Sequence, residues 1–88
     1  MYRIFYTKEF ERRYSELPPL IQRKIEKQEA LFRLNPFHPS LRTEKLLPKR
    51  RELWSMRIDR GYRIVFRFLD DRSVVLINVG PHDRIYRI

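Results

Sequence analysis

The stretch GYRIVFRF, residues Gly61 to Phe68, decides the fold of this chain of 88 residues. Aromatic and β-branched residues dominate it, which indicates a β-strand. Because successive side chains of a strand point to opposite faces, one face is expected to carry Tyr62, Ile64, Phe66 and Phe68. The other face carries Arg63, Val65 and Arg67. The sequence therefore predicts a strand that buries one face and presents two arginines on the other.

The segments before and after this strand also alternate apolar and polar residues, with a period of two. Strands are predicted over Leu53 to Asp59, Tyr62 to Leu69 and Ser73 to Val79. The turns between them, Asp59-Arg60-Gly61 and Asp70-Asp71-Arg72, are short, which is typical of an antiparallel meander. In the first of these strands the apolar face carries Trp54, Met56 and Ile58. Its opposite face adds one more arginine, so that one face of the sheet gathers Arg57, Arg63 and Arg67.

The N-terminal half of the chain contains one more strand and two helical segments. Tyr2 to Tyr6 is a predicted strand, and Thr7 is a predicted N-cap for a helix that ends near Leu17. Pro18 and Pro19 end that helix, and a second helix is expected from Leu20 to about Leu34 because proline is favourable in the first turn. The order is β-α-α-β-β-β. The expected fold class is α+β, one domain over residues 1–88 with a helical hairpin packed on one face of an antiparallel sheet.

Composition limits the classes of function. The chain has no cysteine and two separated histidines, so a disulfide framework, a thiolate metal site and a histidine cluster are all excluded, and no cofactor is expected. Its apolar runs are too short for a membrane helix, and we expect a cytoplasmic protein without a membrane partner. The net charge is +9, of which residues 45–88 carry 11 − 5 = +6. This excess predicts a polyanionic partner for the second half, although positive charge can also serve solubility alone.

Two segments resemble the RelE/ParE superfamily of toxins from type II toxin–antitoxin systems. They are LWSMRIDRGYRIVFRF, residues 53–68, and VVLINVGPHDRIY, residues 74–86, set behind the β-α-α order. The resemblance implies a RelE-like fold and an antitoxin protein, expected to be acidic, that wraps the toxin. Members of the RelE branch cut messenger RNA, usually in the A site of the 70S ribosome, whereas ParE-type members inhibit DNA gyrase without cutting.

RNA cleavage without a metal needs a base for the 2′-OH, cations for the phosphorane and an acid for the 5′-oxygen. Glu44 resembles the base of the YoeB-like members of the RelE branch by its spacing before Trp54, and a solvated loop carboxylate is the alternative. Arg63 matches the arginine that contacts the scissile phosphate. His82 lies where these members keep the general acid, and an imidazole can donate a proton near neutral pH.

Tyr86 resembles the C-terminal tyrosine that stacks on the substrate in these enzymes. The YoeB-like members place that tyrosine directly after the histidine, whereas here Tyr86 lies four positions after His82, so packing in the core is the alternative. The lysine pair of RelE is also missing, with Leu53 and Ser55 near those places. Any catalysis is therefore expected to use the glutamate and histidine.

Further basic residues are expected to contact RNA backbone. Arg57 and Arg67 share the predicted face of Arg63, although an ordinary solvated face is the alternative interpretation. The remaining basic residues would hold flanking RNA without reading its sequence, and these are Lys45, Lys49, Arg50 and Arg51. We expect an endoribonuclease of messenger RNA that inhibits translation. The alternatives are a ParE-like inhibitor of DNA gyrase and a non-toxic remnant that only binds its antitoxin.

Overall fold

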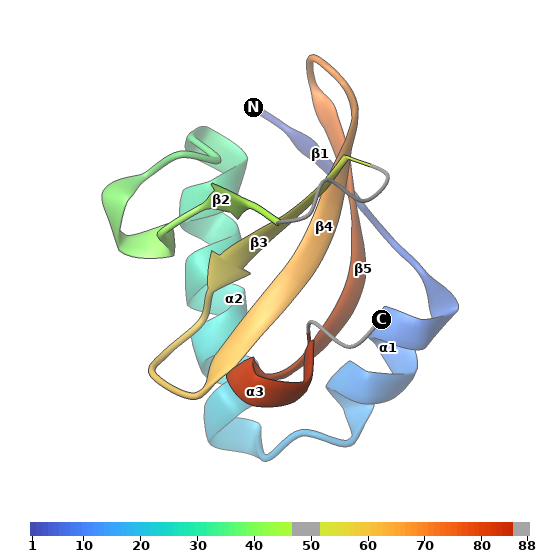
Figure 1. The fold of residues 1–88 in the computed structure, drawn as a ribbon, viewed down its shortest axis with the longest axis vertical. Coiled ribbons are helices and arrows are strands. Elements are labelled where there is room, and N and C mark those ends of the chain that lie inside the picture. Colours follow the sequence, from blue (N-terminus) through green and yellow to red (C-terminus); the bar gives the residue numbers. More distant parts are fainter. Residues whose placement is uncertain (47–51, 86–88) are drawn as a thin grey trace.

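A computed structural model describes residues 1–46 and 52–85 as one mixed sheet with a helical hairpin on one face (Figure 1). The strand order across the sheet is β1-β5-β4-β3-β2. In chain order the elements are β1 (Arg3–Tyr6), α1 (Lys8–Ser15), α2 (Pro19–Leu34), the 3-10 turn η1 (Pro39–Leu41), β2 (Glu44–Lys45), β3 (Leu53–Arg57), β4 (Tyr62–Asp70), β5 (Ser73–Pro81) and α3 (His82–Ile85). The α+β class and the helical hairpin are confirmed.

The helices begin where the sequence predicts. The hydroxyl of Thr7 accepts a hydrogen bond from the backbone N–H of Phe10 at 3.0 Å, as an N-cap residue does. The same hydroxyl donates to the carbonyl of Ile77 in β5, at 2.7 Å, and so ties the start of α1 to the sheet. Pro19 opens α2. No helix in residues 1–46 and 52–85 is long and apolar enough to span a membrane.

The sheet differs from the expected antiparallel one at its β1 edge. β1 pairs with β5 in parallel, with Ile4 opposite Val74, whereas β2, β3, β4 and β5 pair antiparallel as predicted. Alternation of apolar residues predicts that β1 is a strand, but it contains no information on the partner or its direction. The two residues of β2 and the single turn of α3 are additional elements that the sequence analysis did not predict, because both are too short to show a period.

The core lies between α2 and the central strands. Phe32 of α2 is fully buried, and its ring meets that of Phe66 in β4 edge to face, with centroids 5.0 Å apart. Of the core residues predicted from the three strands, four are buried, namely Met56, Ile58, Ile64 and Phe66. The other three are partly buried and pack against this core, namely Trp54, Tyr62 and Phe68. The predicted apolar face of the meander is therefore confirmed.

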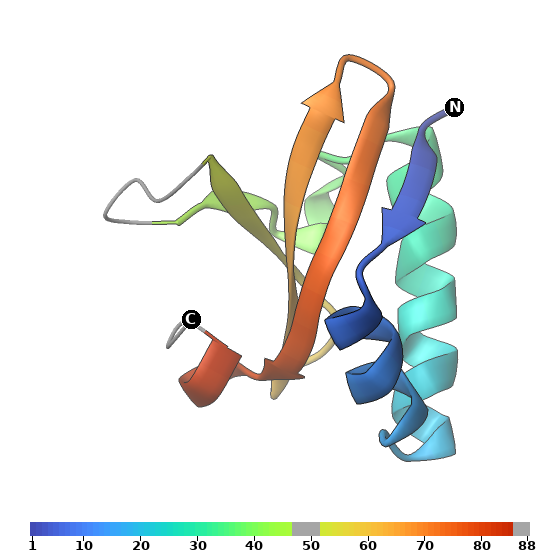
Figure 2. The ribbon, with the colours of Figure 1, turned by 90° about the vertical axis from the view of Figure 1, so that its right-hand side faces the viewer.

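The two faces of the sheet are covered differently. α1 and α2 lie on one side, and α3 lies on the other, toward which β2 and β3 curl (Figure 2). Gly80, in β5, lies beneath α3, since a side-chain carbon at Gly80 would meet the Cδ1 of Ile85 at 3.6 Å. We call the side that carries α3 the open face. It is covered at one end by α3, and it is the face that holds Arg63.

Asp59 fixes the turn between β3 and β4. One carboxylate oxygen accepts from the backbone N–H groups of Gly61 and Tyr62, at 2.9 and 3.0 Å. The other oxygen lies 3.1 Å from the ammonium of Lys24, which joins the turn to α2. Partial burial by itself would raise the pKa of Asp59. The N–H of Gly61, the Lys24 ammonium and the N–H of Tyr62 outweigh it, so the pKa lies below the ordinary value.

We predict that Asp59→Ala lowers the free energy of unfolding by about 2 kcal/mol near neutral pH, because two N–H groups and an ammonium lose a charged acceptor. A carboxyl with a depressed folded pKa stabilises fully above its unfolded pKa and loses this effect as the pH falls through the folded pKa. Urea unfolding should therefore show a difference from the wild type that shrinks below about pH 4. Asp71→Asn, in the exposed turn between β4 and β5, is the control. A difference that stays constant with pH would contradict the role of the charge.

Candidate functional site

The register of the sheet brings the predicted site residues into two adjacent rows on the open face. In one row, Arg57 of β3 lies opposite Arg63 of β4, and Arg63 lies opposite Gly80 of β5. In the next row, Glu44 of β2 lies opposite Ser55 of β3. Residues that face each other across a strand pair lie about 5 Å apart. The sheet thus brings residues from three different strands together at one end, namely Glu44, Arg57 and Arg63.

Arg63 is buried, with 9% of its side chain exposed. Its Nε donates to the hydroxyl of Ser55 at 3.2 Å, and its Nη2 donates to the backbone carbonyl of Arg42 at 2.9 Å. Both acceptors are neutral. A buried charge is costly unless it is hydrogen-bonded and paired, so the guanidinium favours a nearby anion.

Glu44 is the carboxylate beside this arginine. Its Oε1 lies 3.7 Å from Nη2 of Arg63, and 61% of the Glu44 side chain is exposed. That separation is too long for a hydrogen bond, and solvent screens the interaction. Glu44 is therefore a loosely held neighbour of Arg63 and not a tight counterion. The structure brings together the two residues that the sequence analysis predicted as base and phosphate ligand.

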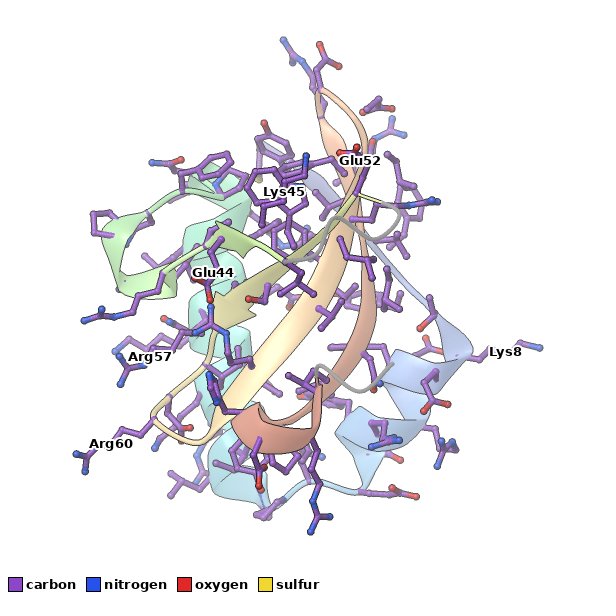
Figure 3. All side chains as sticks on the ribbon, in the orientation of Figure 1. Lys8, Glu44, Lys45, Glu52, Arg57 and Arg60 are labelled. Carbon is purple, nitrogen blue, oxygen red and sulfur yellow. The ribbon has the colours of Figure 1, made fainter. Side chains whose placement is uncertain are left out.

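Arg57 adds a second positive charge directly across from Arg63. Figure 3 shows Glu44 and Arg57 projecting from neighbouring strands at the same edge of the molecule. Like charges opposite each other on two strands repel, which an anion placed between them would relieve. Arg67 lies elsewhere: it is exposed, opposite Leu53 and four residues along β4 from Arg63, or about 13 Å at the rise of a strand.

His82 lies at the end of the same face. It is the exposed first residue of α3, and its backbone N–H donates to the carbonyl of Gly61 at 2.8 Å. Gly61 precedes Arg63 by two residues, which places the backbone of His82 about 7 Å along the sheet from that of Arg63. The strand β5 continues through Pro81, and α3 begins directly after it at His82 and lies on the open face.

The other predicted residues lie elsewhere or are not described. Lys45 lies opposite Trp54 in the strand pair β2–β3. Its Nζ is 5.7 Å from the centre of the Trp54 ring and 2.9 Å from the carboxylate of Glu52. The Lys45 side chain is therefore on the helix side of the sheet. Its role in RNA binding stays a prediction. Four predicted site residues fall outside the described residues, namely Lys49, Arg50, Arg51 and Tyr86.

Sequence reasoning missed two partners of Arg63. Ser55 is fully buried, and its neighbours along β3 are large residues. A single small hydroxyl residue in such a strand is the one signal in the sequence, and it is a weak sign of a polar contact. Arg42 contributes a backbone carbonyl, which no side-chain pattern can reveal. Within residues 1–46 and 52–85, no three histidine, cysteine or acidic side chains are grouped so that they could hold a metal ion.

The fold and the site can now be compared with known proteins. Residues 4–86 match the model of the ParE toxin of the type II toxin–antitoxin system parDE. This match covers nearly the whole chain. The protein is therefore a member of that family, within the RelE/ParE superfamily of toxins.

Solved structures share the fold at low sequence identity. The archaeal RelE–RelB complex from Pyrococcus horikoshii OT3 is similar with a TM-score of 0.77 and 18% identity, over 94% of this chain and 97% of that one. The YoeB/ParE toxin from Agrobacterium tumefaciens gives 0.76 and 20%, over 91% and 98%. The YoeB–YefM complex from Staphylococcus aureus gives 0.74 and 19%, over 93% and 98%. A search of curated protein sequences found no match.

We predict that inorganic phosphate stabilises the folded protein through Arg57 and Arg63, because an anion that binds only the folded state raises the melting temperature. The measurement is a thermal melt in phosphate against chloride at equal ionic strength. Arg63→Gln should abolish the shift, and Arg57→Gln should reduce it. Arg60→Gln is the charge-matched control, since Arg60 lies in the turn and points into solvent (Figure 3). An equal loss of the shift in all three variants would show non-specific screening instead.

Proposed function

We propose that this toxin is an endoribonuclease that cleaves messenger RNA by attack of a 2′-OH on the adjacent phosphate. The observation that carries the proposal is the placement of an exposed carboxylate, Glu44, beside a buried guanidinium, Arg63, on the open face. A base and a phosphate ligand must lie within one nucleotide of each other, and these two do. A loosely held carboxylate remains accessible to accept a proton.

In the proposed reaction Glu44 takes the proton of the 2′-OH, and the 2′-oxygen forms a bond to phosphorus. Arg63, with Arg57 across the strand pair, stabilises the negative charge that develops on the phosphate oxygens. The bond from phosphorus to the 5′-oxygen then breaks, and His82 donates a proton to that oxygen. The products are a 2′,3′-cyclic phosphate and a free 5′-OH. Tyr86 is proposed to support the substrate, as the tyrosine of YoeB-like members does.

The remaining proposed partners follow from charge and from the relatives. The net charge of +9 suits RNA, including the ribosomal RNA of the 70S ribosome, and Lys45, Lys49, Arg50, Arg51 and Arg67 would contact its backbone. Two of the similar structures are complexes, of RelE with RelB and of YoeB with YefM. We therefore propose an acidic antitoxin as the protein partner, and the cytoplasm as the place of action.

One observation favours a second function. The family model that matches is that of the ParE toxin, and the ParE-type members of the superfamily inhibit DNA gyrase. Inhibition of gyrase requires no base or acid beside the arginine. A non-toxic antitoxin-binding remnant would require neither cleavage nor gyrase. The three functions therefore differ in what happens to transcripts and to DNA when the chain is expressed.

We predict that expression of the wild type arrests growth and produces new 5′ ends within coding regions, mapped by primer extension. Arg63→Ala should abolish these ends. Glu44→Gln and His82→Gln should each lower the cleavage rate by about 10²- to 10⁴-fold, the usual contribution of a general base or acid. The matched controls lie outside the site. They are Glu16→Gln at the C-cap of α1, Arg60→Ala in the turn between β3 and β4, and His38→Gln in the proline-rich connection. Arrest with intact transcripts and DNA damage would favour gyrase, and absence of arrest would favour the remnant.

We also predict that the toxin accumulates in larger amounts when its antitoxin is co-expressed. Neutralisation removes selection against the producing cells, and a bound partner stabilises the folded state. The measurement is the soluble yield of the wild type and of Arg63→Ala, each with and without the partner. A partner effect that is equally large for both variants would indicate stabilisation alone, whereas an effect confined to the wild type would indicate toxicity.

A further inference from the structure

Two neutral oxygens of the protein hold one edge of the Arg63 guanidinium. The Nε and Nη2 atoms of an arginine side chain lie on the same edge, and here they donate to the Ser55 hydroxyl and to the Arg42 carbonyl, at 3.2 and 2.9 Å. A guanidinium has five N–H donors in a fixed plane. Two of them are used by these acceptors, so the plane and direction of the other donors are set by the protein and not by the substrate.

The Ser55 hydroxyl is rigidly placed. Ser55 is fully buried in the middle of β3, where it pairs with Val65 of β4 on one side and with Glu44 of β2 on the other. Such a position leaves little freedom to the backbone that carries the hydroxyl. A buried serine that served packing alone would be equally well replaced by an apolar residue of similar shape. Its bond to a buried charge gives the hydroxyl a specific use.

The Arg42 carbonyl is held by an unusual backbone conformation. Arg42 is left-handed, with φ 46° and ψ 48°, at the end of the turn η1. Residues other than glycine seldom adopt this conformation, and it carries an energetic cost where it occurs. From Arg42 the chain continues through Thr43 to Glu44, which pairs with Ser55. Arg63, Arg42, Glu44 and Ser55 therefore form a closed circuit of contacts.

We infer that Ser55, together with the Arg42 carbonyl, is a positioning residue that aims the Arg63 guanidinium at a substrate phosphate and fixes it relative to Glu44. This inference rests on the proposed ribonuclease function and names a residue for it beyond those expected from the sequence. Without the hydroxyl, the Nε of a buried guanidinium loses its acceptor, and the side chain must turn or draw in water. The distance from Arg63 to the phosphate and to Glu44 would change with it.

The test compares Ser55→Thr with Ser55→Val. The two replacements have the same branched shape, so any strain from the added methyl group is shared, and only threonine retains the hydroxyl. We expect Ser55→Thr to keep most of the wild-type kcat for RNA cleavage and Ser55→Val to lose about a hundredfold, the effect of a misplaced catalytic group. The KM should change less than kcat, because the basic residues that bind RNA backbone remain. Equal kcat values for the two variants would overturn the inference.

Two measurements apply even if the protein does not cleave RNA. In nitrogen-15 NMR, the Nε–H signal of Arg63 should be protected from exchange in the wild type and in Ser55→Thr, and unprotected in Ser55→Val. The stabilisation by inorganic phosphate should follow the same order. If these results are obtained but the wild type does not cleave RNA, they would support the positioning role of Ser55 and reject the proposed ribonuclease function. Cleavage by the wild type with the same Nε–H protection and phosphate response in all variants would support the nuclease and reject the positioning role.

Ser55→Ala covers the case in which neither branched residue fits the buried site. Alanine removes the hydroxyl and adds no volume, so this variant is expected to fold and to resemble Ser55→Val in all three measurements. If Ser55→Ala folds and retains the kcat, the Nε–H protection and the phosphate response of the wild type, the inference is wrong.

Discussion

The burial of one positive charge in the sheet is the constraint on which the arrangement of the open face depends. Arg63 is in the central strand β4, and all but 9% of its side chain is buried among the neighbouring strands. The buried guanidinium therefore needs hydrogen-bond acceptors. It obtains them from the Ser55 hydroxyl in β3 and from the Arg42 carbonyl, in the segment before β2. The bond to the Arg42 carbonyl and the pairing of Glu44 with Ser55 together hold Glu44 beside Arg63. The candidate site of Glu44 and Arg63 is thus built around Arg63, the less exposed of these two charged side chains.

The sequence was sufficient for the elements that have a clear period or a clear cap. Thr7, Pro19 and the alternation from Trp54 to Phe68 determine local conformations through contacts within a few residues, so the helices and the meander could be predicted. The parallel pairing of β1 with β5 could not, because it depends on contacts between the two ends of the chain. The two residues of β2 owe their strand conformation to β3 and not to their own sequence.

The same distinction applies to the candidate site. Glu44, Arg63 and His82 carry side chains of recognisable chemistry at spacings that resemble a family, and each could be proposed from the sequence. The Arg42 carbonyl belongs to the backbone, and the contact of Ser55 depends on a cross-strand register, so neither follows from residue types. Lys45 is predicted to bind RNA from its charge, which contains no information on the face it occupies. The alternation of the two-residue strand β2 turns it toward Trp54, on the other face from Arg63.

Two tyrosine–glutamate hydrogen bonds join α2 to β1 and to α1. On the hairpin side, the hydroxyls of Tyr6 and Tyr14 donate to Glu29 and Glu26, and burial together with the bond to Glu29 raises the pKa of Tyr6 to about 12. The hairpin, residues 8–34, carries seven basic and five acidic side chains, a net charge of 7 − 5 = +2, so as a whole it does not repel a polyanion. The preference of a polyanion for the open face is therefore expected from the placement of Arg57 and Arg63 across one strand pair, and not from the net charge of the hairpin.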